Sequence, residues 1–197
     1  GSNNGDDGAT VQVEKHVAGA TVRKAYLITA PTPRDNLTDL TITNGGNSLT
    51  IARADYDATA TGADNQENGR IDITSFVKPI VDAAPAGLVD FTIVESETFE
   101  TDGEVLVVIF NDPSVTDPRS VVLVFGAQDQ GGDSFSIGLA DPFDDATQDI
   151  IMSLGISFGF QGFMGTGQVS LVDVNGQRIT SAAGGQDDCD IFEPSVE

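Results

Sequence analysis

Two short runs, residues 105–110 and 121–125, are apolar at every position and rich in β-branched side chains. They are too short for typical helices, and a strand that is apolar at every position is expected to be buried on both faces of a sheet. The sequence therefore predicts two central strands. Residues 111–119 between them are rich in turn-forming residues, which predicts a hairpin-like connection.

Other segments alternate between apolar and polar residues, as strands with one solvent-facing side do. The alternation covers residues 11–17, 21–28 and 89–94. Asn175-Gly176 lies between two further strand-like segments and suits a type I′ hairpin turn. Strands therefore account for most of the expected regular structure.

Helix signals are scarce. Thr74 is a candidate cap for a short helix over residues 75–83, and residues 144–153 are a second candidate helix. Strands separated by acidic, glycine-bearing loops predict an all-β fold, a β-sandwich with jelly-roll or Greek-key connections and one or two short helices. We expect one ligand-binding domain over residues 9–190, a flexible leader over 1–8 that opens like an expression-tag remnant, and a flexible tail over 191–197.

The chain is strongly acidic. It carries 31 Asp and Glu against 9 Lys and Arg, a formal net charge of −22. This charge repels phosphate backbones and anionic membranes, so neither nucleic-acid binding nor membrane insertion is expected. It also opposes folding unless cations neutralise it, and oxygen-rich loops favour Ca²⁺. Cys189 is the single cysteine, so no disulfide forms within the chain and cysteine usage leaves the compartment open.

Several loops combine carboxylates with glycine, which lets backbone carbonyls turn toward a cation. The most regular one spans residues 64–72, but Ser75 stands where a calcium loop of this spacing has a bidentate Glu. An ordinary solvated turn is the alternative for each loop. The expected metal ligands are Asp64, Asn68, Asp102, Glu104, Asp129, Asp133, Gln186, Asp187 and Asp188. The expected ligand-binding residues are Tyr56, Gln128, Gly132 and Gly185, with Tyr56 as the one plausible exposed aromatic.

A serine hydrolase is not expected, although residues 155–159 match the pattern G-x-S-x-G. The only histidine, His16, precedes Ser157 and lies on an alternating strand, where a solvent-facing position is the simpler interpretation. With one histidine, zinc is also not expected. The sequence predicts a protein that is not an enzyme.

Residues 102–114, 122–128, 131–135, 154–161 and 170–188 resemble ligand-binding domains near the tips of large bacterial RTX adhesins. The chain looks most like the calcium-dependent peptide-binding domain of that group. The resemblance implies a β-sandwich that captures the free carboxylate end of a partner protein through a bound calcium ion. The nonapeptide calcium repeat that names the wider group is absent from this sequence.

The first interpretation is therefore a calcium-dependent cell-adhesion module, secreted or on a bacterial cell surface and active in biofilm formation. It would bind a peptide or protein C-terminus on a target cell, as a monomeric module within a longer chain. Three alternatives stay open: a carbohydrate-binding module that takes a glycan, a structural stalk domain rigidified by calcium and, last, a hydrolase.

Overall fold

The computed structural model describes residues 8–31, 37–62, 66–96, 101–117, 119–129, 132–144, 147–155 and 171–181. The chain divides into two compact units, Gly1–Gln130 and Gly131–Glu197, and each is described by itself. The expectation of a single domain over residues 9–190 stays a prediction.

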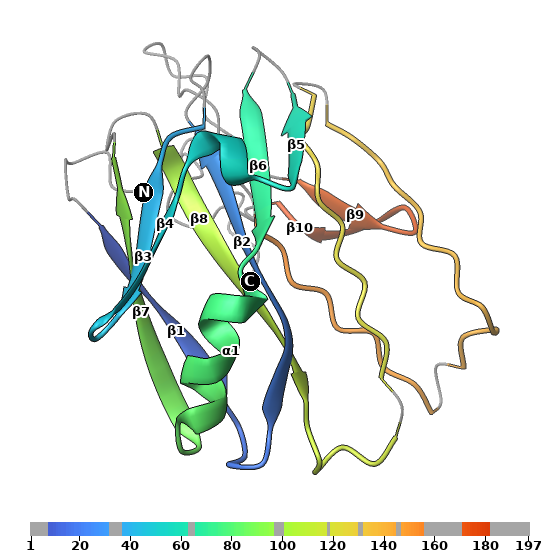
Figure 1. Ribbon diagram of the computed structural model, residues 1–197. Coiled ribbons are helices and arrows are strands. Elements are labelled where there is room, and N and C mark those ends of the chain that lie inside the picture. The colour runs from blue at the N-terminus through green and yellow to red at the C-terminus, as the bar shows by residue number, and fades with distance from the viewer. Residues whose placement is uncertain are drawn as a thin grey trace. The chain divides into compact units, whose positions relative to one another are not determined.

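The first unit is an all-β sandwich of two four-stranded antiparallel sheets, as the sequence predicts (Figure 1). The first sheet has the order β1 (Ala9–Lys15), β7 (Gly87–Glu95), β3 (Leu40–Asn44) and β4 (Asn47–Ile51). The second sheet has the order β5 (Ala58–Thr61), β6 (Glu67–Asp72), β2 (Thr21–Pro31) and β8 (Thr101–Asn111). A 3-10 turn, η1, covers Arg53–Asp55, and one helix, α1, covers Thr74–Ala83. The chain crosses from one sheet to the other after β1, β2, β4, β6 and β7.

The core lies between the sheets, and the alternation in the sequence accounts for it. In β7 the residues Val89, Phe91 and Ile93 are buried, while the residues between them are exposed. Leu27 of β2 meets them from the second sheet and is fully buried. Burying one such side chain contributes about 1.5–3 kcal/mol.

Helix α1 packs against β2 and confirms the helix predicted over residues 75–83. Its residues Val77 and Val81 are fully buried in the core. Thr74 does not cap the helix, because Ile73 occupies the cap position and the Thr74 hydroxyl accepts a hydrogen bond from the backbone N–H of Ala25 at 2.9 Å. The prediction of Thr74 as the cap was therefore wrong.

The C-terminal end of α1 is closed by Lys15, a residue of β1 that is only 1% exposed. Its Nζ donates to the backbone carbonyls of Val81 at 3.0 Å, Asp82 at 2.9 Å and Ala84 at 2.8 Å. The last carbonyls of a helix have no partner within the helix and carry partial negative charge. The Lys15 ammonium group therefore gives these carbonyls a hydrogen-bond partner. The three bonds also use all of its N–H donors, although the side chain is buried.

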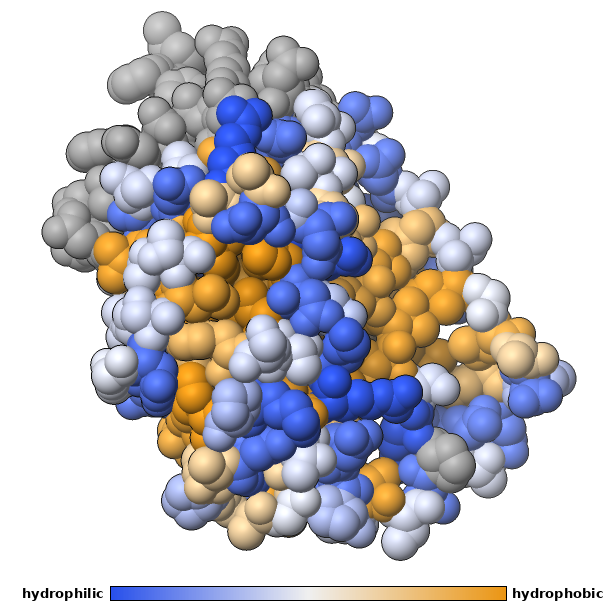
Figure 2. Space-filling view, viewed as in Figure 1, coloured by the Kyte–Doolittle hydropathy of each residue, from blue (hydrophilic) through white to orange (hydrophobic). Residues whose placement is uncertain are grey.

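The two runs predicted as central strands behave differently. Residues 105–110 do form a strand within β8, but β8 lies at the edge of the second sheet, where Val105 is 38% exposed. Residues 121–125 are described and hold no strand, and Val121 is 62% exposed. Both runs were therefore wrongly predicted as central, and so was the hairpin between them, because β8 takes β2 as its partner. Figure 2 shows hydrophobic side chains at the surface between hydrophilic ones.

The second unit contains a hairpin of β9 (Val172–Val174) and β10 (Gln177–Thr180). Asn175 and Gly176 form its turn with φ angles of 51° and 76°, so the predicted type I′ hairpin is confirmed. The described residues of 144–153 hold a turn, in which the N–H groups of Thr147 and Gln148 donate to the carbonyl of Asp144. The second predicted helix is not formed among these residues.

Candidate functional site at one end of the sandwich

One expected site residue, Glu104, lies on a row of the second sheet, and a second, Tyr56, lies over that row. Strand β2 pairs with both β6 and β8, and the register places Gly69, Thr29 and Glu104 side by side. Thr29 is only 2% exposed, so this row faces the first sheet. The ring of Tyr56 lies over Gly69, because a Cβ on that glycine would be 2.7 Å from Tyr56 Cδ1. Tyr56 and Glu104 therefore share the interior of the sandwich at this end.

The first sheet contributes Glu95, the last residue of β7. Glu95 continues the buried alternation of that strand and is 7% exposed. Its carboxyl group is hydrogen-bonded to that of Glu104 across the two sheets. Burial, then this neighbouring carboxyl group, raise the pKa of Glu104 to about 8. Two carboxyl groups share a hydrogen bond only if one carries a proton, so Glu95 and Glu104 join the two sheets through a shared proton.

Tyr56 is not the exposed aromatic that the sequence predicts. It is half-buried, and burial raises the pKa of its hydroxyl, with smaller contributions from the charges of Glu104 and Asp39. The reason is Gly69, whose missing side chain leaves room for the ring. The hydroxyl oxygen of Tyr56 and Oε1 of Glu104 are buried and have no hydrogen-bond partner among the described residues. A buried polar atom without a partner costs about 1–3 kcal/mol, so such atoms commonly mark a bound ion, water or ligand.

Asn68 lies next to Gly69 but on the opposite face of the second sheet, because side chains alternate along a strand. Its Nδ2 donates to the backbone carbonyl of Gly126 at 3.0 Å, and its Oδ1 is buried without a partner among the described residues. Gln128 lies close to Gly62, the residue after β5. A Cβ on Gly62 would be 2.8 Å from the carbonyl oxygen of Gln128. Two more of the expected residues therefore lie at the same end of the second sheet.

Arg70 of β6 contacts the segment that contains Phe125 on the outer face of the second sheet. Its guanidinium group lies 5.5 Å from the ring centre of Tyr26 and 5.7 Å from that of Phe125. The same group donates to Asp57 at 2.9 Å, so the cation is both stacked and paired.

The other expected residues are not brought into this group. Asp129 directly follows Gln128, while Gly132 and Asp133 belong to the second unit. The backbone of Asp102 lies in β8, but its side chain is outside the described residues. The remaining expected residues that lie outside the described parts of the chain are Asp64, Gly185, Gln186, Asp187 and Asp188.

The described residues fit a metal ion only in part. Within the described ranges, no group of three or more His, Cys, Asp or Glu side chains lies close enough to hold one. Glu95 and Glu104 supply two carboxyl groups, and any further protein oxygens would come from the neighbouring loops. His16 is exposed as predicted, with Nδ1 3.4 Å from Glu14, and Ser157 lies outside the described residues. No helix in the described parts of the chain has the length and apolar character needed to span a membrane.

No protein-family model, curated protein or solved structure matches the chain. The resemblance to RTX adhesin domains therefore rests on the sequence motifs alone. Sequence reasoning missed Glu95, although a signal was present: Glu95 falls on the same alternation as Val89, Phe91 and Ile93, which places it inside the sandwich.

Proposed function

We propose that the chain is a calcium-dependent cell-adhesion module of the RTX-adhesin kind that binds the C-terminus of a peptide or protein on a target cell. The observation that carries the proposal is the buried oxygen-rich end of the sandwich. There Glu104 and Tyr56 present buried oxygens without partners among the described residues, next to the carboxyl group of Glu95.

The chemistry of this end suits a hard cation. Carboxylate, hydroxyl and carbonyl oxygens are the ligands that calcium takes in proteins, and a divalent ion would offset part of the net charge of −22. Glu95 and Glu104 would hold the ion together with oxygens of the neighbouring loops. Because the two carboxyl groups share a proton, the affinity for calcium is expected to rise with pH as Glu104 loses that proton.

A calcium ion with an open coordination position accepts a carboxylate from a partner. The acidic surface of the protein repels anions in general. A terminal carboxylate would therefore bind only at the calcium ion, at this end of the sandwich. Such a module acts outside the cell, either secreted or on the bacterial surface, where calcium is abundant.

The test is calorimetric titration with short peptides whose C-terminus is free or amidated, in calcium and in chelator. We expect binding only for the free carboxylate in calcium. Glu104→Gln, which removes one of the two carboxyl groups that would hold the ion, is expected to weaken it, while Glu14→Gln, at an exposed position of β1, leaves it unchanged. Peptide binding that survives both amidation and chelation contradicts the proposal, and retention on a glycan array instead would favour a carbohydrate-binding module.

Calcium is also expected to raise the melting temperature. An ion that binds only the folded chain adds about 2.7 kcal/mol at a concentration 100 times its Kd. Differential scanning calorimetry in calcium and in chelator measures this shift. A shift without peptide binding would leave a structural stalk domain, and an unchanged melting temperature would remove calcium from the proposal.

A further inference from the structure

A short segment of the first unit, residues 123–128, lies against the outer face of the second sheet, and we call it the strap. Its side chains alternate between half-buried and exposed, and Phe125 is one of the half-buried ones. The strap holds no strand, so individual contacts with β6 keep it in place. One of them is the hydrogen bond from Nδ2 of Asn68 to the carbonyl of Gly126 at 3.0 Å.

Arg70 of β6 makes a second contact with the strap. Its guanidinium group lies close to two rings, 5.7 Å from the centre of Phe125 and 5.5 Å from that of Tyr26. Nε and Nη2 of the same group donate to Oδ1 of Asp57 at 3.1 and 2.9 Å. Phe125 therefore contacts a cation that is also bonded to the segment just before β5.

Asp57 is fixed to β6 through both its backbone and its side chain. Its N–H donates to the carbonyl of Arg70 at 3.0 Å, and its Oδ2 accepts from the N–H of Asp72 at 2.7 Å. Tyr56 directly precedes Asp57, and its ring lies over Gly69, the neighbour of Arg70 in β6. The position of the Tyr56 ring therefore depends on how firmly Arg70 and Asp57 hold each other.

We propose that Arg70 and Asp57 are positioning residues for Tyr56, and that the strap stabilises this arrangement through Phe125. The inference deepens the proposed function and rests on it for the consequence in ligand binding. The buried hydroxyl of Tyr56 has no hydrogen-bond partner among the described residues. A phenol donates as well as accepts, so this hydroxyl can donate to one oxygen of a terminal carboxylate while calcium holds the other. A displaced ring would lose that bond.

The test follows the ring of Tyr56 by NMR in protein made with isotope-labelled tyrosine, in chelator and without peptide. The chain has two tyrosines, so Tyr56→Phe assigns the signals. We expect Phe125→Leu to shift the Tyr56 signals toward those of an exposed tyrosine, because leucine lacks the aromatic face that attracts the Arg70 cation. Phe125→Tyr keeps that face and is expected to leave the Tyr56 signals in place.

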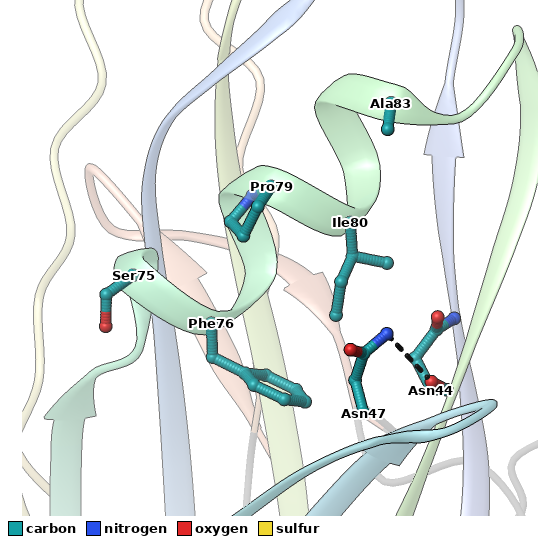
Figure 3. Close-up of a pocket in the computed structure, with 7 residues that line it drawn as sticks. All are labelled: Asn44, Asn47, Ser75, Phe76, Pro79, Ile80 and Ala83. Carbon is teal, nitrogen blue, oxygen red and sulfur yellow. Dashed lines mark hydrogen bonds between the residues drawn. The ribbon is translucent and has the colours of Figure 1, made fainter.

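Two controls separate this effect from a general disturbance. Val124→Ala changes the neighbouring strap residue, whose side chain is 52% exposed. Asn47→Ala changes an exposed residue in the groove between α1 and the β3–β4 hairpin, whose lining comes from α1, β3 and β4 (Figure 3). Neither control should move the Tyr56 signals.

Peptide titration in calcium adds the functional measurement. Phe125→Leu is expected to weaken binding of a peptide with a free C-terminus about threefold, as the loss of one exposed cation–π contact would give, and Phe125→Tyr to restore it. Tyr56→Phe, which removes only the hydroxyl, is expected to weaken binding about tenfold, as the loss of a hydrogen bond to a charged group would give.

Tyr56 signals that stay in place in Phe125→Leu, or that move equally in Val124→Ala or Phe125→Tyr, overturn the positioning role. Equal peptide binding by the native protein and Tyr56→Phe overturns the role of the hydroxyl. If the signals move as expected but the native protein binds no peptide, the positioning role stands and the proposed function fails instead.

Discussion

Replacing Lys15 by Met tests how much the closure of α1 stabilises the first unit. Methionine keeps the apolar stem but removes the ammonium group that donates to three carbonyls at 2.8–3.0 Å. A hydrogen bond from a charged donor contributes about 1.5–3 kcal/mol. The three bonds share one donor group, and each buried or part-buried carbonyl left without a partner costs about 1–3 kcal/mol, so we expect a loss near ~4 kcal/mol.

Urea denaturation followed by circular dichroism measures this loss. With a slope of about 2 kcal/mol per molar urea, a loss of about 4 kcal/mol lowers the midpoint by about 2 M. The control is Lys24→Met, because Lys24 pairs with Asp72 at 2.7 Å but its side chain is 48% exposed, and an exposed pair contributes little. If Lys15→Met and Lys24→Met have the same midpoint, the reasoning is refuted.

Two further predictions concern the row of the second sheet that holds the candidate site. Gly69→Ala is expected to cost about 1–3 kcal/mol, since its Cβ would lie 2.7 Å from Tyr56 Cδ1, and thermal unfolding should show no comparable loss for Gly46→Ala, where nothing lies within 4 Å. In chelator, stability should fall as pH rises from the ordinary pKa of Glu104, 4.5, to its folded pKa of about 8, because the folded chain holds the proton more tightly. The free energy of unfolding from urea denaturation should decline across this range by at most about 1.4 kcal/mol per pH unit, and this decline should flatten in Glu104→Gln; equal slopes for both proteins would contradict the shared proton.

Much of the sandwich follows from local patterns. The alternation over residues 89–94 correctly predicts which side chains of β7 point inside. Asn175-Gly176 correctly predicts the turn between β9 and β10, because few residues other than Asn and Gly adopt positive φ. The strand pairing was less predictable. Residues 105–110 are apolar on both faces, but composition does not indicate whether a strand has a neighbouring strand on one side or on both. The sequence therefore predicted a central strand where β8 is an edge strand.

The candidate site was predicted in part. A carboxylate beside a glycine marked Glu104, and the structure brings Tyr56 to the same row. The link between Glu95 and Glu104 depends on residues of two different sheets meeting across the core, which no local spacing encodes.

The ammonium group that closes α1 also affects the order in which the chain can fold. Its three acceptors lie 66, 67 and 69 residues further along the chain. During synthesis the first strand leaves the ribosome long before the helix exists, and the carbonyls of the last helical turn lack the Lys15 ammonium until that strand is in place. Contacts over such separations slow folding, so the N-terminal strand is expected to dock late and with the helix as one cooperative step.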